Sequence, residues 1–225
     1  MRTLVVPARV IAAPRVARLL IATIAAALIL VPAALAQQYK STPGLAPSSE
    51  IPAAYAGKLA PGFQIADASG KPYCEIWFVK TAPSGPKTND DAVTLQTFPV
   101  GSLLGVVRFD GNGSDRRGQQ VKPGVYALRY AWMPNTGTHV GAAPQRDFGL
   151  LVRIADDKDP AATFTLDQTI NLSRQASGTG HPFVFSIASG TGSEGFTKEN
   201  DHDWTLHTKV GGQALDMIVI GKVES

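Results

Sequence analysis

Four histidines and one arginine–aspartate pair are the side chains of this sequence that could bind a ligand or a metal. His139 lies in the stretch TGTHVGAAPQRDF, which ends in Arg146 and Asp147. His181 precedes a proline in SGTGHP, and His202 lies between two aspartates in ENDHDW. Glycine, proline and asparagine in these stretches are typical of loops. Four of the residues are therefore candidates for ligand binding: His139, Arg146, Asp147 and His181.

A metal site is a second interpretation of the same loops. Imidazole nitrogens combined with a carboxylate suit zinc, copper or non-haem iron. The candidate metal ligands are His139, His181, His202 and Asp203. None of them has the spacing of a helical HExxH motif, and the alternative role of such loop histidines is contact with solvent or nearby backbone. No cofactor other than a metal is indicated.

Arg146 could bind a carboxylate, a phosphate or a sugar hydroxyl, because its guanidinium group presents several N–H donors in one plane. Arg146 and Asp147 stand at the start of a predicted strand, where neighbouring side chains point to opposite faces. They can share one compact site only if the strand begins at a bulge. The alternative role of Arg146 is structural, as a forked ion pair or as a donor to loop carbonyls.

Motifs for nucleophilic catalysis and phosphate binding are absent from the sequence. It contains no G-x-S-x-G elbow, and the glycine-rich stretch 189–195 lacks the lysine of a phosphate-binding loop. The stretch 110–118 (DGNGSDRRG) resembles a calcium loop, but Asp115 stands where the turn needs glycine and Val121 where a bidentate glutamate is needed. We expect a hairpin turn there.

Alternating apolar residues predict that these loops are held by a mainly β, antiparallel fold. The clearest strand signal is 121–133 (VKPGVYALRYAWM), where a Pro-Gly turn precedes alternating aromatic residues. One helix is expected between the capping-box pair Thr165 and Gln168 and a stop at Gly178. A hairpin over 203–222 is expected to turn at two glycines. Further strands are expected over 62–66, 72–80, 92–98, 102–109, 147–154 and 182–188.

The strands do not alternate regularly with helices, which argues against a parallel βαβ fold. We therefore expect an antiparallel β-sandwich of about eight or nine strands with one short helix. Aromatic residues in the strands could form a ligand platform, although their usual role is packing in the core.

The N-terminus has the pattern of a secretory signal peptide. Residues 1–18 contain four arginines and no acid, residues 19–31 are uncharged and mostly apolar, and Pro32 precedes the small-residue sequence ALA that ends at Ala36. This order predicts cleavage after Ala36 and a secreted or periplasmic protein that meets the membrane only during export. An uncleaved membrane anchor is the alternative. Residues 37–61 are expected to be a flexible leader, and 62–225 the β-sandwich domain.

Charge and cysteine content limit the possible partners. The whole chain has 21 Lys+Arg and 18 Asp+Glu, a formal charge of +3, and removal of the four signal arginines leaves 17 against 18, or −1. Nucleic-acid binding needs clustered, uncompensated cations, so nucleic acid is not expected as a partner. Cys74 is the only cysteine. We expect a buried thiol that packs as a small apolar group; metal or haem ligation or an intermolecular disulfide are its alternatives.

The motifs KPGVYALRY, APQRDFGLL and SRQASGTGHP together resemble those of uncharacterised secreted bacterial β-sandwich proteins. The resemblance covers most of the chain after Ala36 and implies the same fold, but it brings no known activity and no functional residue. KPGVYALRY alone is similar to a strand entry of transthyretin-like and other immunoglobulin-like modules.

The leading functional hypothesis is an exported, non-enzymatic β-sandwich module. It would bind an unidentified ligand or envelope partner through the loops at 134–146, 177–182 and 189–202. The second hypothesis is a metal-binding protein or metal-dependent enzyme that uses the loop histidines. The third is a structural cell-envelope module.

Overall fold

The computed structural model describes residues 38–86, 88, 93–133 and 146–223. The predicted signal peptide and His139 lie outside these ranges. No helix within them is long and apolar enough to cross a membrane. The elements in chain order are β1 (Tyr39–Leu45), α1 (Ala53–Ala56), β2 (Gly62–Asp67), β3 (Pro72–Phe78), β4 (Leu103–Phe109), β5 (Gly113–Ser114), β6 (Gln120–Val121), β7 (Gly124–Trp132), β8 (Asp147–Arg153), α2 (Leu166–Ser177), β9 (Val184–Ser189), β10 (Gly195–Lys198), β11 (Trp204–Val210) and β12 (Gln213–Ile220).

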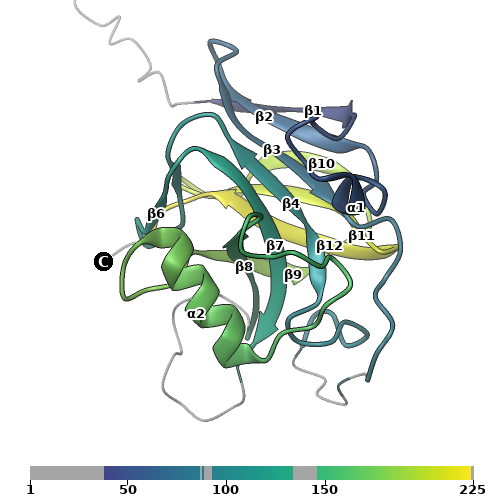
Figure 1. Cartoon of the computed structure of the whole chain (residues 1–225). Helices are drawn as coiled ribbons and strands as arrows, with labels where there is room; N and C mark the ends of the chain where they lie inside the picture. Colours follow the sequence, from purple (N-terminus) through teal and green to yellow (C-terminus); the bar gives the residue numbers. More distant parts are fainter. Residues whose placement is uncertain (1–37, 87, 89–92, 134–145, 224–225) are drawn as a thin grey trace, which may run out of the picture. The chain divides into compact units, whose positions relative to one another are not determined.

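Ten strands form one sheet in the order β1-β2-β3-β4-β7-β8-β9-β12-β11-β10, and β5 pairs with β6 in a separate small hairpin (Figure 1). All neighbouring strands of the large sheet are antiparallel. The prediction of a mainly β, antiparallel fold is confirmed. The predicted hairpin turn near 110–118 is also confirmed by the β5–β6 pair.

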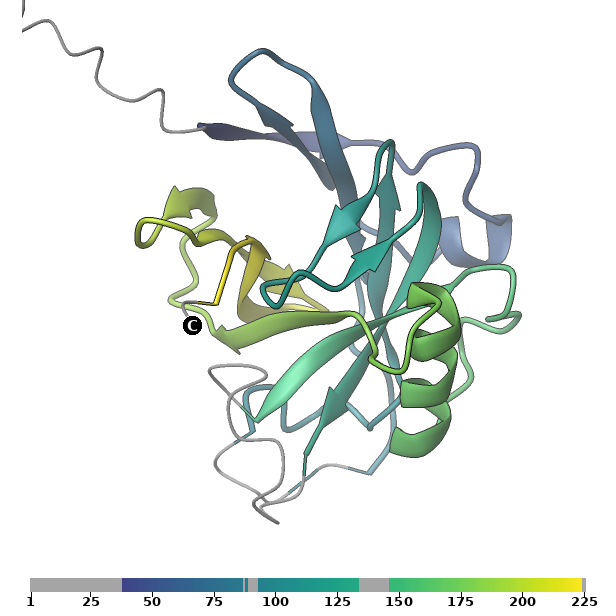
Figure 2. The same ribbon diagram turned by 90° about the vertical axis from the view of Figure 1, so that its left-hand side faces the viewer.

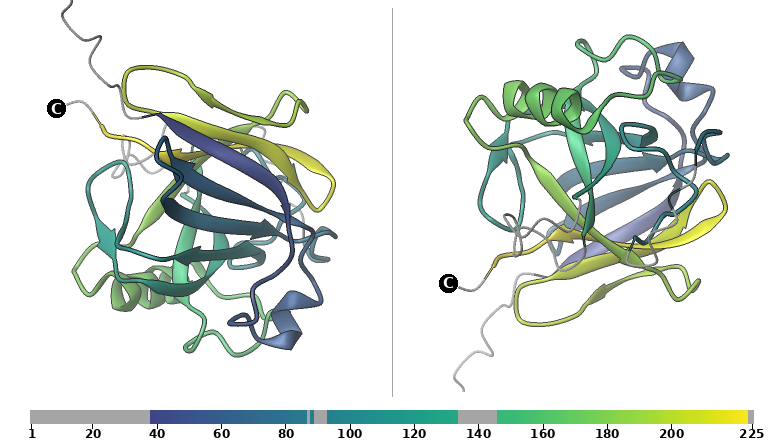
Figure 3. Two further views of the ribbon diagram at one scale, coloured as in Figure 1. Left: turned by 90° about the horizontal axis from the view of Figure 1, so that it is seen from above. Right: turned by 90° about the horizontal axis from the view of Figure 1, so that it is seen from below.

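The large sheet curls until its two edges, β1 and β10, lie close together, as the views from above and below show (Figure 3). Aromatic rings connect the two edges, since the ring of Tyr39 in β1 lies 5.7 Å from that of Trp204 in β11, which stacks on Phe196 in the edge strand β10. The sheet is therefore nearly barrel-shaped. The predicted sandwich of eight or nine strands is wrong in strand number and in arrangement, and the immunoglobulin-like similarity finds no support in this topology.

Residues 37–61 were predicted to be a flexible leader, and the structure corrects this for the described part of the segment. β1 pairs with β2 from Tyr39 to Leu45, and α1 carries Tyr55, whose side chain is 1 % exposed. The Tyr55 hydroxyl donates to the carbonyl oxygen of Asp157 at 2.7 Å. The compact domain therefore begins at Gln38, and α1 is a second helix that the sequence did not predict.

The inner face of the sheet is filled by side chains that alternate along the strands. Ile76, Phe109, Leu128, Phe185 and Met217 all belong to this core and are almost fully buried. Cys74 is also buried in it, so the predicted packing role of the thiol is confirmed.

Helix α2 covers part of the outer face of the curled sheet. It lies across the barrel from the C-terminal strands β11 and β12 (Figure 2). Leu166 and Ile170 pack against Phe148, Leu150 and Val184. Its predicted ends are confirmed, because Thr165 and Gln168 form a capping box and Gly178 has a left-handed conformation. The predicted C-terminal hairpin is also confirmed as β11 and β12.

The predicted strand at 92–98 is wrong over its described residues, which form turns instead. The backbone N–H groups of Thr94 and Leu95 donate to the carboxylate of Asp147 at 2.7 and 3.3 Å. Because a side chain accepts these hydrogen bonds, the segment buries Leu95 and Phe98 without a β-ladder.

Candidate functional site

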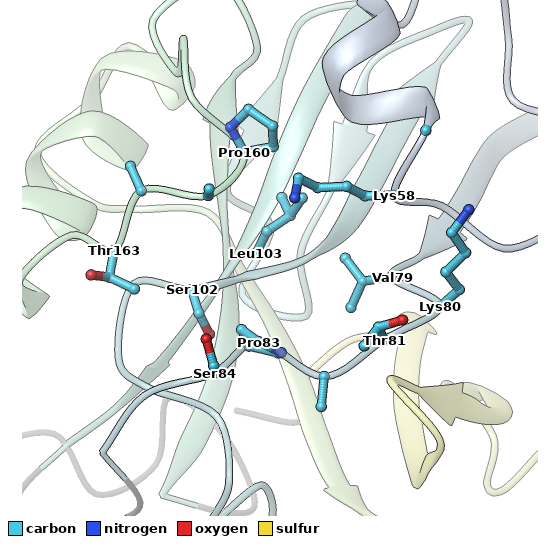
Figure 4. A pocket seen from close by; sticks show the side chains of 14 residues that line it. Lys58, Val79, Lys80, Thr81, Pro83, Ser84, Ser102, Leu103, Pro160 and Thr163 are labelled. Carbon is cyan, nitrogen blue, oxygen red and sulfur yellow. The ribbon is translucent and has the colours of Figure 1, made fainter.

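A pocket of about 360 Å³ opens where several loops meet beside β3 and β4 (Figure 4). We call it the lysine pocket. Its floor and walls are mainly small or apolar, and two lysines and several hydroxyls line it. The lining residues are Gly57, Lys58, Val79, Lys80, Thr81, Ala82, Pro83, Ser84, Ser102, Leu103, Pro160, Ala161, Ala162 and Thr163.

Ser102 is the distinctive polar group of the lysine pocket. The residue is 1 % exposed, and its Oγ is the one buried side-chain polar atom among the described residues that has no hydrogen-bond partner. A buried hydroxyl without a partner costs about 1–3 kcal/mol, so native proteins rarely keep one without a reason. A ligand oxygen or nitrogen in the pocket would give Ser102 that partner.

Lys58 and Lys80 supply the positive charge of the pocket. The backbone N–H of Lys80 donates to the carbonyl oxygen of Lys58 at 3.0 Å, so the two residues are adjacent in space. Both side chains are exposed, and within the described ranges neither ammonium group forms an ion pair. Two cations that have no ion-pair partner in the described ranges, placed beside a buried hydroxyl, favour an anionic ligand.

Arg129 fixes the position of two segments that line the pocket, the one that contains Ser102 and the loop 157–163. Its side chain is fully buried and forms a forked ion pair with Asp157, with both N···O distances 2.6 Å. The remaining N–H groups donate to the carbonyl oxygens of Gly101, Ala162 and Asp159 at 3.1, 2.6 and 2.9 Å. All five donors of the guanidinium group are therefore used. This single cation connects β7 to the segment before Ser102 and to the loop 157–163.

Gly101 allows these two walls to approach each other. Its φ of +77° lies in the left-handed region, and an added Cβ would stand 2.0 Å from the carbonyl oxygen of Phe164. The Phe164 ring lies under the guanidinium group of Arg129, 4.8 Å from ring centre to Cζ. Only glycine satisfies both the conformation and the close contact.

The predicted ligand-binding pair Arg146 and Asp147 has structural contacts. Arg146 donates to the carbonyl oxygen of Met133 at 3.1 and 3.0 Å and lies over the Trp132 ring. The alternative role of Arg146 as a donor to a loop carbonyl is thus observed. Asp147 is fully buried, and its carboxylate also accepts hydrogen bonds from the hydroxyls of Thr94 and Tyr130 at 3.0 and 3.1 Å. The oxygens of Asp147 thus connect residues 94–95 to β7 and β8, which is a structural role.

His181 lies at the other end of the β7–β8 pair from Arg146 and Asp147. Asp147 is opposite Trp132, whereas Arg153, at the far end of β8, is opposite Tyr126. Six residues of extended chain span about 20 Å. The exposed His181 follows Thr179, whose hydroxyl bonds to Gln119 beside β6. The structure does not bring His181 and Arg146 together, and His139 lies outside the described residues.

The carboxylate of Asp203, a predicted metal ligand, accepts hydrogen bonds from one arginine and one asparagine. Arg116 donates to both of its oxygens at 3.0 and 2.7 Å, and the Asn200 amide adds a third bond at 2.9 Å. Burial raises the pKa of Asp203, but the hydrogen bonds from Arg116 and Asn200 outweigh burial and leave that pKa below its ordinary value. His202 is exposed. Within the described ranges no group of three or more His, Cys, Asp or Glu is arranged to hold a metal.

Sequence reasoning missed Ser102, both pocket lysines and Arg129. One signal for Arg129 was available, because a charged residue stands in the otherwise apolar run VYALRYAW. A buried arginine needs a buried acceptor, but nothing in the sequence identifies Asp157 as that acceptor. Lys58 lies in the segment that had no predicted structure.

Comparison of this chain with family models, with curated proteins and with solved structures found no match.

Proposed function

We propose that this protein is a binding module whose lysine pocket takes a small ligand bearing a carboxylate or phosphate group. The observation that carries the proposal is the buried Ser102 hydroxyl, which has no partner within the described residues and lines a pocket with two exposed, unpaired lysines. The pocket volume of about 360 Å³ lies at the lower end of the usual range for small-molecule sites.

Binding would give three polar side chains of the pocket, those of Ser102, Lys58 and Lys80, a partner that they lack among the described residues. An oxygen of its anionic group would accept the hydrogen bond of Ser102 and remove the penalty of the unpaired hydroxyl. The ammonium groups of Lys58 and Lys80 would balance its charge, with each contact worth about 1 kcal/mol at an exposed rim. Val79, Leu103 and Pro160 offer an apolar surface for the rest of the molecule.

We also propose that binding takes place outside the cytoplasm. The support is the signal-peptide pattern of residues 1–36, with cleavage after Ala36. N-terminal sequencing of protein recovered from the periplasm or medium tests this, and a chain that retains residues 1–36 would contradict cleavage.

Thermal unfolding with added phosphate, citrate or glucose tests the binding proposal. At ten times its Kd, a ligand stabilises the folded protein by about 1.4 kcal/mol, which raises the Tm of a domain of this size by about 3–6 °C. Phosphate or citrate should produce this shift and neutral glucose should not. The double variant Lys58→Gln/Lys80→Gln should lose the shift. Lys122→Gln, which removes an exposed lysine outside the pocket, is the matched control.

The proposal fails if neither anion binds, or if Lys122→Gln weakens binding as much as the double variant does. The first result would favour a structural envelope module, and the second would show only general attraction of anions to surface charge.

A further inference from the structure

A second group of polar side chains lies on the outer face of the sheet, away from the lysine pocket. It spans the neighbouring strands β10, β11 and β12. His207 in β11 is directly opposite Asp216 in β12. Thr197 in β10 is opposite Thr205 in β11, two residues before His207. The alternate residues Leu206 and Met217 point into the core, so the polar residues share the outer face.

The polar side chains form a continuous chain of contacts. Nδ1 of His207 lies 2.8 Å from Oδ1 of Asp216, and Nε2 lies 2.7 Å from Oγ1 of Thr197. Carboxylate, imidazole and hydroxyl thus follow one another, with the imidazole in hydrogen-bond reach of both neighbours. This is the geometric signature of an activated hydroxyl nucleophile, in which the carboxylate orients the histidine that takes the hydroxyl proton.

A hollow of about 190 Å³ lies beside the imidazole and is lined by residues of β9, β11 and β12 together with Glu199. Ser186 of β9 lines it and is 2 % exposed. Unlike that of Ser102, its Oγ keeps access to solvent, and it makes no hydrogen bond within the described part of the chain. In the sheet, β9 lies two strands beyond β11, so Ser186 stands on the side of the hollow away from Thr197. The hollow therefore provides space beside the imidazole, and Ser186 offers a hydrogen bond to the end of a small ester that is remote from the reacting carbonyl group.

We propose that Thr197, His207 and Asp216 form an acyl-transfer site that hydrolyses activated esters of small carboxylic acids. The Thr197 proton passes to Nε2 of His207 as Oγ1 bonds to the ester carbonyl carbon. The bond from that carbon to the leaving oxygen then breaks, and the leaving alcohol takes the proton from Nε2. Water repeats the sequence on the acyl-threonine, which releases the carboxylic acid and restores Thr197.

Glu199 sets the resting state of this site. The Thr197 hydroxyl donates to Oε1 of Glu199, which also lies 3.3 Å from Nε2 of His207. A hydroxyl has one proton, so this bond competes with proton transfer to His207. Removal of the competing acceptor in Glu199→Ala should therefore increase the rate of acylation.

This inference departs from the sequence-based hypothesis of a non-enzymatic module, and it is independent of the lysine pocket. Sequence patterns of the G-x-S-x-G kind could not reveal it, because its residues come from three strands and not from one turn.

The test is reaction of the full chain with p-nitrophenyl acetate, followed by release of p-nitrophenolate and by mass spectrometry of the acid-quenched protein. The expected results are catalysed release, an acetyl group on the peptide that contains Thr197, or both. His207→Gln should lower the rate by about 100-fold or more, as expected for loss of a general base. Asp216→Asn should also lower it, because the amide no longer fixes the tautomer of His207.

Two matched controls separate this mechanism from nonspecific ester cleavage. Thr42→Val changes an exposed threonine of β1 outside the hollow and should leave the rate unchanged, whereas Thr197→Val should abolish acylation. His181→Gln removes an exposed histidine and should also have no effect. If catalysed release of p-nitrophenolate persists in Thr197→Val, or if the acetyl group is found only on lysines, the proposal is overturned. Thr197→Val preserves the shape of the side chain, so the test remains available if His207→Gln does not fold.

Discussion

Replacement of Ser102 by alanine should stabilise the ligand-free protein while weakening its affinity for anions. The Ser102 hydroxyl is buried and has no partner among the described residues, which costs about 1–3 kcal/mol. The substitution removes one oxygen and with it a few dispersion contacts of about 0.1–0.2 kcal/mol each. The net gain should be about 1 kcal/mol, which raises the Tm by about 2–4 °C.

Urea denaturation measures this change as a higher midpoint at an unchanged m-value. Ser173→Ala is the matched control, because Ser173 is also fully buried but its hydroxyl is paired. It accepts from the N–H of Phe183 at 3.1 Å and contacts the Phe183 carbonyl oxygen at 3.3 Å. Loss of these bonds should cost about 1–3 kcal/mol, less up to about 0.5 kcal/mol for the better helix propensity of alanine.

The two serine-to-alanine changes should therefore have opposite signs. If Ser102→Ala lowers stability as Ser173→Ala does, then the Ser102 hydroxyl is satisfied in the free protein, for example by an ordered water. The reasoning that assigns its free donor to a ligand would then be refuted. A stabilised variant with unchanged affinity for phosphate and citrate would also separate Ser102 from ligand binding.

Three other ionisable side chains, Arg129, Asp203 and Cys74, can be tested by substitution or labelling. Arg129→Met should cost about 3–5 kcal/mol in urea denaturation, because Asp157 would remain buried without its cation; a loss below about 1 kcal/mol would contradict this. The wild type should be more stable than Asp203→Asn, fully so above pH 3.8, the ordinary pKa of aspartate, and this difference should vanish as pH falls through the lowered pKa of folded Asp203. Urea denaturation from about pH 5 to about pH 2 measures the difference. A difference that does not change with pH would be evidence against the ion pair with Arg116. Burial raises the pKa of the Cys74 thiol, so Ellman's reagent should label it only after unfolding, and rapid labelling of the native protein would show that the thiol is accessible.

Elements stabilised by local contacts were predicted correctly from the sequence. Helix α2 begins at the capping box of Thr165 and Gln168 and ends at Gly178, and all of these contacts lie within a few residues of one another. The β11–β12 hairpin turns at its two adjacent glycines, both with positive φ. A two-residue turn also fixes the register, so the pairing of His207 with Asp216 could have been found by counting outward from the turn.

Edge strands and turns that depend on distant partners were missed. β1 has mostly exposed side chains, so its sequence has no alternating apolar pattern, and it is a strand because its backbone pairs with β2. Val93, Leu95 and Phe98 are apolar residues suited to a strand, but the carboxylate of Asp147 accepts hydrogen bonds from the N–H groups of Thr94 and Leu95, and the segment forms turns. Such hydrogen bonds depend on partners that are far away in the sequence.

The sequence by itself determined a β-rich, antiparallel fold, the bounds of one helix and one hairpin, and a buried cysteine, since each depends on alternation or on neighbouring residues. The tertiary structure decided how the sheet curls and which polar residues meet. Ser102 and Ala162 line one pocket because Arg129 connects segments that are distant in the chain. Burial of that cation requires acceptors from every side, and only the folded chain assembles them.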